Sequence, residues 1–177
     1  MAVIIKHQQI VADSWQLLKP ATGGSSSYVS PVGDVIVPLA FWLERREALL
    51  SRAGRLAVWL DSHEEPAAIA GDLDRFALVA VNFPAFGDGR GYSIARLLRE
   101  RHGYKGELRA IGEVVRDHLF FMASCGFDAF LLRDDQDPEE ALTGFGDFSD
   151  GYQASVERPL PLSRRRFLVS PDGMEWS

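Results

Sequence analysis

Cysteine is nearly absent from this chain, and histidine is scarce. Its 177 residues include one cysteine, Cys125. One thiol excludes an intramolecular disulfide, a C-x-x-C redox pair and an iron–sulfur cluster bound by this chain alone, since such a cluster needs several thiolates. The histidines do not stand at metal-ligand spacing; they are His7, His63, His102 and His118. We therefore expect no metal and no cofactor.

An excess of positive charge and a long apolar run are also missing. The chain has 19 Lys and Arg against 25 Asp and Glu, which gives a formal charge of −6. This balance argues against nucleic acid or an anionic membrane as a partner, so any small anion must be bound by a local group of cations. The apolar stretch near Met1 is too short for a signal-peptide core or a membrane span. We expect a cytoplasmic protein.

Regular alternation of apolar strands and amphipathic helices is the main pattern that is present. Strands are predicted at 35–38, 55–60, 76–83, 107–112 and 129–132, and helices at 39–53, 66–73, 91–102 and 116–125. Such βαβ crossovers predict an α/β fold with about five mainly parallel strands, either as an open sheet or as a partial barrel. The chain is too short for a complete eightfold barrel, which usually needs roughly 200 residues or more.

The chain is predicted to form a single α/β domain of 177 residues. Residues 1–33 hold short strand candidates at 2–5 and 9–11 and then a loop rich in Gly, Ser and Thr. The βα repeats occupy 34–156, where glycine-interrupted helical turns continue to about 156. Residues 157–177 form an irregular tail whose three successive arginines are typical of a solvated surface.

Local signals predict where several helices begin and end. Gly54 is expected to end the helix at 39–53, and residues 62–65 resemble a capping box. Gly126, followed by Phe127, predicts a Schellman ending, beside which Cys125 packs as a small core residue. Asp137 is expected to cap the helix that begins at the next residue, a proline.

The helix after Gly91 is predicted to turn one apolar stripe toward the core. The stripe consists of Ile94, Ala95, Leu97 and Leu98. Arg99 and Arg101 lie away from it and are expected to remain in water.

A candidate site lies where the strand at 76–83 joins this helix through Gly87, Gly89 and Gly91. Glycine permits positive φ and close approach of a ligand, and the N–H groups of a helix start favour anions. The spacing fits neither a dinucleotide fingerprint, because Tyr92 stands where the third glycine belongs, nor a P-loop, because the lysine is missing. We predict that an anion or a partner binds at Gly89, Arg90, Gly91, Tyr92, Ser93 and Arg96, together with Arg109 from a neighbouring strand.

Arg109 is the second unusual residue, because it lies inside a strand that the pattern predicts to be covered on both faces. A buried guanidinium needs a carboxylate, and the candidates are Asp88 first and Glu113 second. The alternative is an edge strand with one wet face. Asp88 and Glu113 are also the candidate catalytic residues. Further polar residues follow the other strands and serve either in the same site or as turns and caps: Asp61, His63, Arg133 and Asp134.

Two stretches resemble a known family: residues 88–118 (DGRGYSIARLLRERHGYKGELRAIGEVVRDH) and 125–130 (CGFDAF), with further likeness at 13–15 and 37–40. The family is DUF934, bacterial proteins of unknown function whose members are labelled as oxidoreductases of sulfite reduction. His118 departs from the pattern, in which glutamine is expected. The resemblance implies a place in sulfate assimilation, with sulfite reductase or another sulfur-assimilation protein as partner.

Two classes of function follow. Sulfite reduction uses sirohaem and an iron–sulfur cluster, which one cysteine cannot hold, so this chain is not the catalytic reductase. The first class is an accessory protein that docks on the reductase or binds a small anion. The second is a small α/β enzyme that acts on an anionic metabolite at Asp88, Arg90, Arg109 and Glu113. An exposed apolar-rimmed face beside Arg90 favours docking, whereas a closed pocket that holds Asp88, Arg109 and Glu113 favours chemistry.

Overall fold

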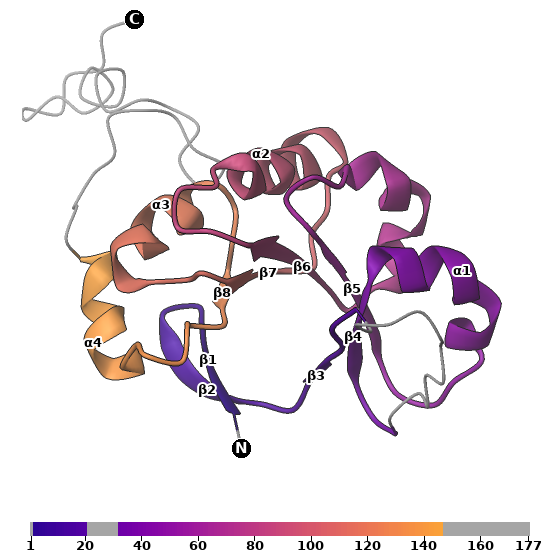
Figure 1. Cartoon of the computed structure of the whole chain (residues 1–177), viewed down its shortest axis with the longest axis horizontal. Helices are drawn as coiled ribbons and strands as arrows, with labels where there is room; N and C mark the ends of the chain where they lie inside the picture. The colour runs from indigo at the N-terminus through magenta and orange to yellow at the C-terminus, as the bar shows by residue number, and fades with distance from the viewer. Residues whose placement is uncertain (1, 21–31, 147–177) are drawn as a thin grey trace, which may run out of the picture.

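The computed structural model describes residues 2–20 and 32–146, which form a mixed α/β fold around one curled, open sheet (Figure 1). The sheet has eight strands in the order β2-β1-β8-β7-β6-β5-β4-β3. Their bounds are β1 Ala2–Lys6, β2 Gln9–Asp13, β3 Gln16–Leu17, β4 Val35–Pro38, β5 Leu56–Leu60, β6 Leu78–Phe83, β7 Glu107–Gly112 and β8 Ala129–Phe130. From β3 to β8 neighbouring strands are parallel. The sheet curls along this order into a half-barrel (Figure 1).

Helices cover the convex side of this half-barrel (Figure 1). They are α1 Leu39–Leu50, the 3-10 helix η1 Pro66–Arg75, α2 Arg90–Arg96, the π-helical η2 Leu97–Arg101, η3 Arg116–His118, α3 Leu119–Ser124, α4 Pro138–Leu142 and η4 Thr143–Phe145. None of the helices in the described ranges is both long and apolar enough to cross a membrane.

The predicted α/β class and the five predicted strands are confirmed, but the strand count is wrong. The sheet also contains the antiparallel hairpin β1–β2, which joins the edge of β8, and the two-residue strand β3 beside β4. His7 and Gln8 turn the hairpin with positive φ, without the Asn-Gly or Asp-Gly pair that marks such turns. The strand candidates at 2–5 and 9–11 are confirmed as β1 and β2, but their place beside β8 depends on pairing with distant residues. β3 is too short to show a strand pattern.

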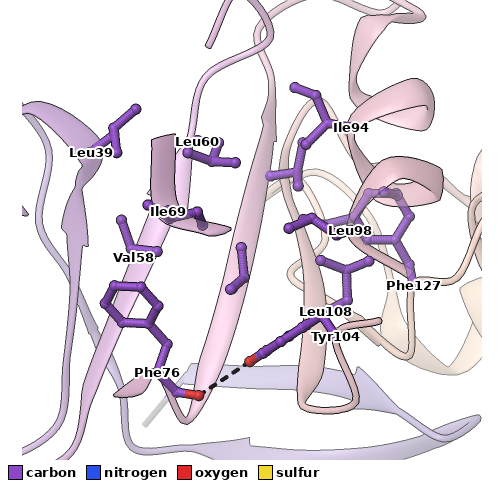
Figure 2. Packing of buried hydrophobic residues seen from close by; sticks show 14 of the residues in the cluster. Leu39, Val58, Leu60, Ile69, Phe76, Ile94, Leu98, Tyr104, Leu108 and Phe127 are labelled. Atoms are coloured by element: carbon purple, nitrogen blue, oxygen red, sulfur yellow. Dashed lines mark hydrogen bonds between the residues drawn. The ribbon is translucent and has the colours of Figure 1, made fainter. Parts of the chain in front are cut away.

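Alternation along each strand divides the apolar side chains between two cores. In β5, Val58 and Leu60 point to the helices, while Ala57 and Trp59 point to the concave face. Figure 2 shows the helix-side core, where the Tyr104 hydroxyl donates to the Phe76 carbonyl oxygen at 3.3 Å. Within residues 2–20 and 32–146, the concave face therefore carries its own smaller apolar cluster and no second layer of helices.

The prediction for the helix after Gly91 is correct in part. Ile94, Ala95 and Leu98 are buried and Arg101 is exposed, but Leu97 is 39% exposed. The Arg99 side chain is only 13% exposed. A π turn adds one residue per turn, which rotates the following side chains relative to an α-helical stripe. Leu97 and Arg99 both lie in this segment, where the α-helical spacing that the prediction assumed does not hold.

Arg99 is buried together with hydrogen-bond acceptors, including one carboxylate. Its guanidinium donates to the carbonyl oxygens of Tyr104, Gly106 and Gly126 at 2.8–3.0 Å. It also forms an ion pair with Asp128 at 3.3 Å. Arg99 therefore ties η2 to the segment that leads into β8, and the predicted exposure of Arg99 is wrong.

The Schellman ending is confirmed. The Phe127 amide donates to the Met122 carbonyl and the Gly126 amide to the Ala123 carbonyl, while Gly126 takes a φ of 113°. Cys125 is fully buried beside it, and desolvation raises the pKa of its thiol.

We expect the Cys125 thiol to react with an aromatic disulfide reagent such as DTNB only as fast as the native structure opens. The thiolate is the reactive species, and burial disfavours both the thiolate and access of the reagent. The absorbance of the chromophore that the reaction releases measures the labelling rate. The same protein in denaturant is the control. Immediate native labelling would contradict the buried placement.

The other predicted caps have mixed outcomes. Asp137 caps α4 as predicted, because its carboxylate accepts the amides of Glu139 and Glu140. α1 ends at Leu50 rather than at residue 53, and Gly54 lies beyond it in a turn with φ 98°. No capping box forms on η1, because its N-cap residue is Glu65, which makes no side-chain cap hydrogen bond, and the Glu64 carboxylate accepts the backbone amide of Asp61 instead. The predicted turns from 147 to 156 and the tail at 157–177 lie outside the described residues.

Candidate functional site

The loop between β6 and α2 contains a local ion pair rather than a shared cluster. Arg90 donates to both Asp88 oxygens, with the shortest distance 2.6 Å, and the Arg90 backbone amide also donates to Asp88. These hydrogen bonds hold the pKa of Asp88 well below its ordinary value. A carboxyl group that stays ionised is a weak general base near neutral pH, so this geometry favours a turn-stabilising role for Asp88.

The three glycines of this loop do not take positive φ. A Cβ atom on Gly91 would lie 2.7 Å from the ring of Phe83, so glycine there permits close packing of α2 on β6. Gly87 has open space around it, and Gly89 stands before the first residue of α2. The positive φ that glycine permits is therefore not used here, because the chain makes this turn with ordinary φ values.

An exposed group of aromatic side chains lies beside this loop. We define the aromatic patch as Phe86, Tyr92, His118 and Phe121. The rings of Phe86 and His118 are 4.5 Å apart, and those of Tyr92 and Phe121 are 4.7 Å apart. Phe86 is 61% exposed and Phe121 is 49% exposed, whereas Tyr92 is half-buried against Phe83. The patch thus spans the β6–α2 loop, α2 and the η3–α3 segment on the helix side of the sheet.

The remaining residues predicted for this loop lie on the surface of α2. Ser93 is exposed, and Arg96 is an ion-pair partner of Glu100 at 3.6 Å. Arg96 also lies close enough to Cys125 to lower the pKa of that thiol, against the larger effect of burial. Arg90 and Arg96 are therefore both cations of α2, the helix that contributes Tyr92 to the aromatic patch.

Arg109 is buried and paired with carboxylates, as predicted, but the partners are different. Its side chain is 2% exposed, and it donates to Asp13 at 3.1 Å and to Glu107 at 2.8 Å. β7 lies between β6 and β8, so the edge-strand alternative is wrong. Small residues, Ala80 and Ala129, stand beside Arg109 in the neighbouring strands and leave room for the guanidinium.

Asp88 and Glu113 do not pair with Arg109 because they lie at the other end of the sheet. Glu113 lies four residues after Arg109, which corresponds to about 13 Å at the rise of a strand. Asp13 reaches Arg109 because the β1–β2 hairpin folds beside β8, and Glu107 shares its face of β7. A cavity of about 470 Å³ lies here, at the amino ends of the parallel strands. The four residues predicted for an enzyme site are therefore in three separate places.

A second cavity, of about 480 Å³, lies on the concave face at the carboxyl ends of the strands. In parallel α/β folds this edge is where ligands bind. We call it the carboxyl-end cavity. Its lining includes three residues that follow predicted strands, Glu113, Arg133 and Asp134. The curl of the sheet adds residues from the opposite edge, because Leu17, Lys19 and Pro20 line the same cavity.

The base of the carboxyl-end cavity is apolar and its rim is charged. Trp59, Ile111 and Leu131 belong to the concave-face cluster. The indole N–H of Trp59 donates to the Leu18 carbonyl at 2.8 Å, which fixes the segment before Lys19 over β5. Sequence reasoning missed Trp59, Asn82 and Lys19. Asn82, a polar residue in an apolar strand, was the available signal.

Gly112 places Glu113 at this rim. Gly112 has φ 90°, and a Cβ there would overlap the Phe83 carbonyl oxygen and the Asn82 side-chain oxygen. The bend lets the Glu113 amide donate to the Phe83 carbonyl at 2.8 Å. The Glu113 carboxylate then accepts from Arg133 at 2.7 Å.

The other strand ends carry a smaller polar group. The Asp61 carboxylate accepts from the side-chain amide of Asn82 at 3.1 Å and from the backbone amide of Ser62 at 2.8 Å. The imidazole Nδ1 of His63 lies 3.7 Å from the same carboxylate. Within residues 2–20 and 32–146, no group of three or more His, Cys, Asp and Glu is arranged to hold a metal ion.

Fold and site together define an α/β half-barrel protein with a ligand-sized cavity at the carboxyl ends of its strands. Residues 57–163 match the family model described as "Bacterial protein of unknown function (DUF934)". The match covers more than half of the chain, so the protein belongs to the DUF934 family, as the resemblance predicted. The matched range begins at residue 57, so the likeness at residues 13–15 and 37–40 lies outside it and stays a prediction. A comparison with curated proteins finds no match.

Proposed function

We propose that this protein is an accessory component of assimilatory sulfite reduction that docks on the reductase through the aromatic patch. The patch is the observation that carries the proposal: two of its phenylalanines, Phe86 and Phe121, are well exposed, and the exposed cation Arg90 begins α2, the helix that contributes Tyr92 to it. Aromatic and arginine side chains are enriched at protein interfaces and supply most of their binding energy. The sulfite pathway itself comes from the labels carried by other members of the family.

Two features favour docking over catalysis of the reduction. One cysteine, buried in the core, leaves this chain without the thiolates that an iron–sulfur cluster requires. Asp88, Arg109 and Glu113, which an enzyme site would bring together, are each committed to a different ion pair: Asp88 with Arg90, Arg109 with Asp13 and Glu107, and Glu113 with Arg133.

The test measures binding of the purified chain to the sulfite reductase of its own host by surface plasmon resonance. Phe86→Ser and Phe121→Ser are each expected to weaken binding by roughly thirtyfold, equivalent to about 2 kcal/mol for a central interface aromatic. Leu43→Ser is the matched control, because Leu43 is also an exposed apolar residue but lies on α1, away from the patch. It is expected to bind as tightly as the parent chain.

Growth provides the second readout. Deleting the gene should slow growth of the host on sulfate or sulfite but not on cysteine, and the Phe121→Ser gene should fail to restore it. Absence of binding to the reductase, or equal losses in the patch and control variants, would overturn the docking proposal. Normal growth of the deletion strain on sulfite would overturn the pathway.

A further inference from the structure

The carboxyl-end cavity has a charge pattern that selects one class of ligand. Its lining in the described chain includes two cations, Lys19 and Arg133, and two carboxylates, Glu113 and Asp134. The cavity volume of about 480 Å³ is in the range of small-molecule sites. These charges stand over the apolar base formed by Trp59 and its neighbours.

Arg133 is already held by two carboxylates, which limits what it can offer to an anion. Its Nε and one terminal nitrogen donate to Asp135 at 2.6 and 2.7 Å, and its other terminal nitrogen donates to Glu113 at 2.7 Å. An ion with negative charge alone would meet this neutralised guanidinium and the nearby carboxylates of Glu113 and Asp134. The local balance therefore disfavours a small dianion such as sulfite.

Acceptors for a cationic or amine group are available on the same rim. Asp134 is exposed, and Glu113 directs one oxygen to Arg133 while its side chain remains partly open to solvent. The Asn82 side chain donates to Asp61 through its nitrogen, so its carbonyl oxygen is the atom turned toward Gly112 and the cavity lining. On the other side, Lys19 comes from the opposite edge of the sheet.

We propose that the carboxyl-end cavity binds a small zwitterion with an apolar side chain, the chemistry of a free amino acid or a dipeptide. The ligand ammonium group faces Glu113 and Asp134, its carboxylate faces Lys19, and its side chain packs on Trp59 and Ile111. Each end of such a ligand meets opposite charge, and the apolar part covers the cluster on the concave face. This site is separate from the aromatic patch and does not depend on docking to a reductase.

Isothermal titration calorimetry on the full chain tests this with L-leucine and glycyl-L-leucine, which distinguish a free amino acid from a dipeptide. 4-Methylpentanoate lacks the amine of leucine, and 3-methylbutylamine lacks its carboxylate. Each is expected to bind at least about tenfold more weakly than the better zwitterion, since one charge-assisted hydrogen bond is lost. Sodium sulfite is the dianion probe and is expected to bind more weakly still.

Variants assign the two ends of the ligand. Glu113→Gln should weaken zwitterion binding about tenfold without weakening 4-methylpentanoate binding, whereas Lys19→Met should spare 3-methylbutylamine. Glu44→Gln on α1 is the matched control, and thermal melts verify that each variant is folded. Lack of binding of both zwitterions at about 10 mM would overturn the proposal, since that excludes even millimolar affinity. Equal affinity for leucine and its single-charge analogues, or tighter binding of sulfite, would also overturn it.

Discussion

Replacing Arg109 with alanine should lower the free energy of unfolding by about 3–5 kcal/mol, the cost of leaving buried partner charges uncompensated. Asp13 and Glu107 would lose their shared cation in a region where the Arg109 side chain is 2% exposed. Arg109 also ties β2 to β7, which are separated by β1 and β8 in the sheet. Urea denaturation followed by circular dichroism measures the change.

Arg90→Ala is the control for this effect, because Arg90 is an exposed cation whose ion pair with Asp88 is local. It should leave the denaturation midpoint near that of the parent chain. A double variant, Arg109→Met with Asp13→Asn, should be more stable than Arg109→Ala, since one stranded charge is removed and the apolar stem is retained. If Arg109→Ala is neutral and Arg90→Ala destabilises, the buried pair does not support the fold as described.

Gly112→Ala should destabilise the protein by about 2–5 kcal/mol and disturb the carboxyl-end cavity at the same time. A left-handed φ costs a non-glycine residue roughly 1–2 kcal/mol, and overlap with packed atoms costs roughly 1–3 kcal/mol more. The added Cβ would meet the Phe83 carbonyl oxygen, which is backbone, and the Asn82 side-chain oxygen. Chemical denaturation measures the stability, and calorimetry with the leucine probes measures the cavity.

Gly87→Ala is the matched control for Gly112→Ala. A Cβ added at Gly87 would meet no atom within 4 Å, and Gly87 does not take positive φ. Alanine there should be tolerated and can even stabilise the loop slightly, because it narrows the unfolded ensemble. Equal losses for the two variants would show that the bend at Gly112 is not the cause.

Local sequence patterns predicted those parts of the fold that depend on neighbouring residues. The apolar strands from Val35 to Phe130, the Schellman ending at Gly126 and the Asp137 cap all arise from interactions within a few positions along the chain. The exposure of Leu97 and Arg99 was mispredicted because the prediction assumed α-helical spacing through these residues. A π turn changes the helical phase, and no signal within those residues announced it.

The sequence by itself determined that Arg109 needs carboxylates and that polar residues follow the parallel strands. Only the tertiary structure decided that Asp13 and Glu107 satisfy Arg109, because the pairing of β1 with β8, which brings Asp13 near, leaves no local pattern. The curl of the sheet likewise brought Lys19 to the cavity that Glu113 and Arg133 line. Strand pairing and sheet curvature sum weak interactions between distant segments, so they fix which charges meet, while short-range periodicity fixes only where each strand and helix forms.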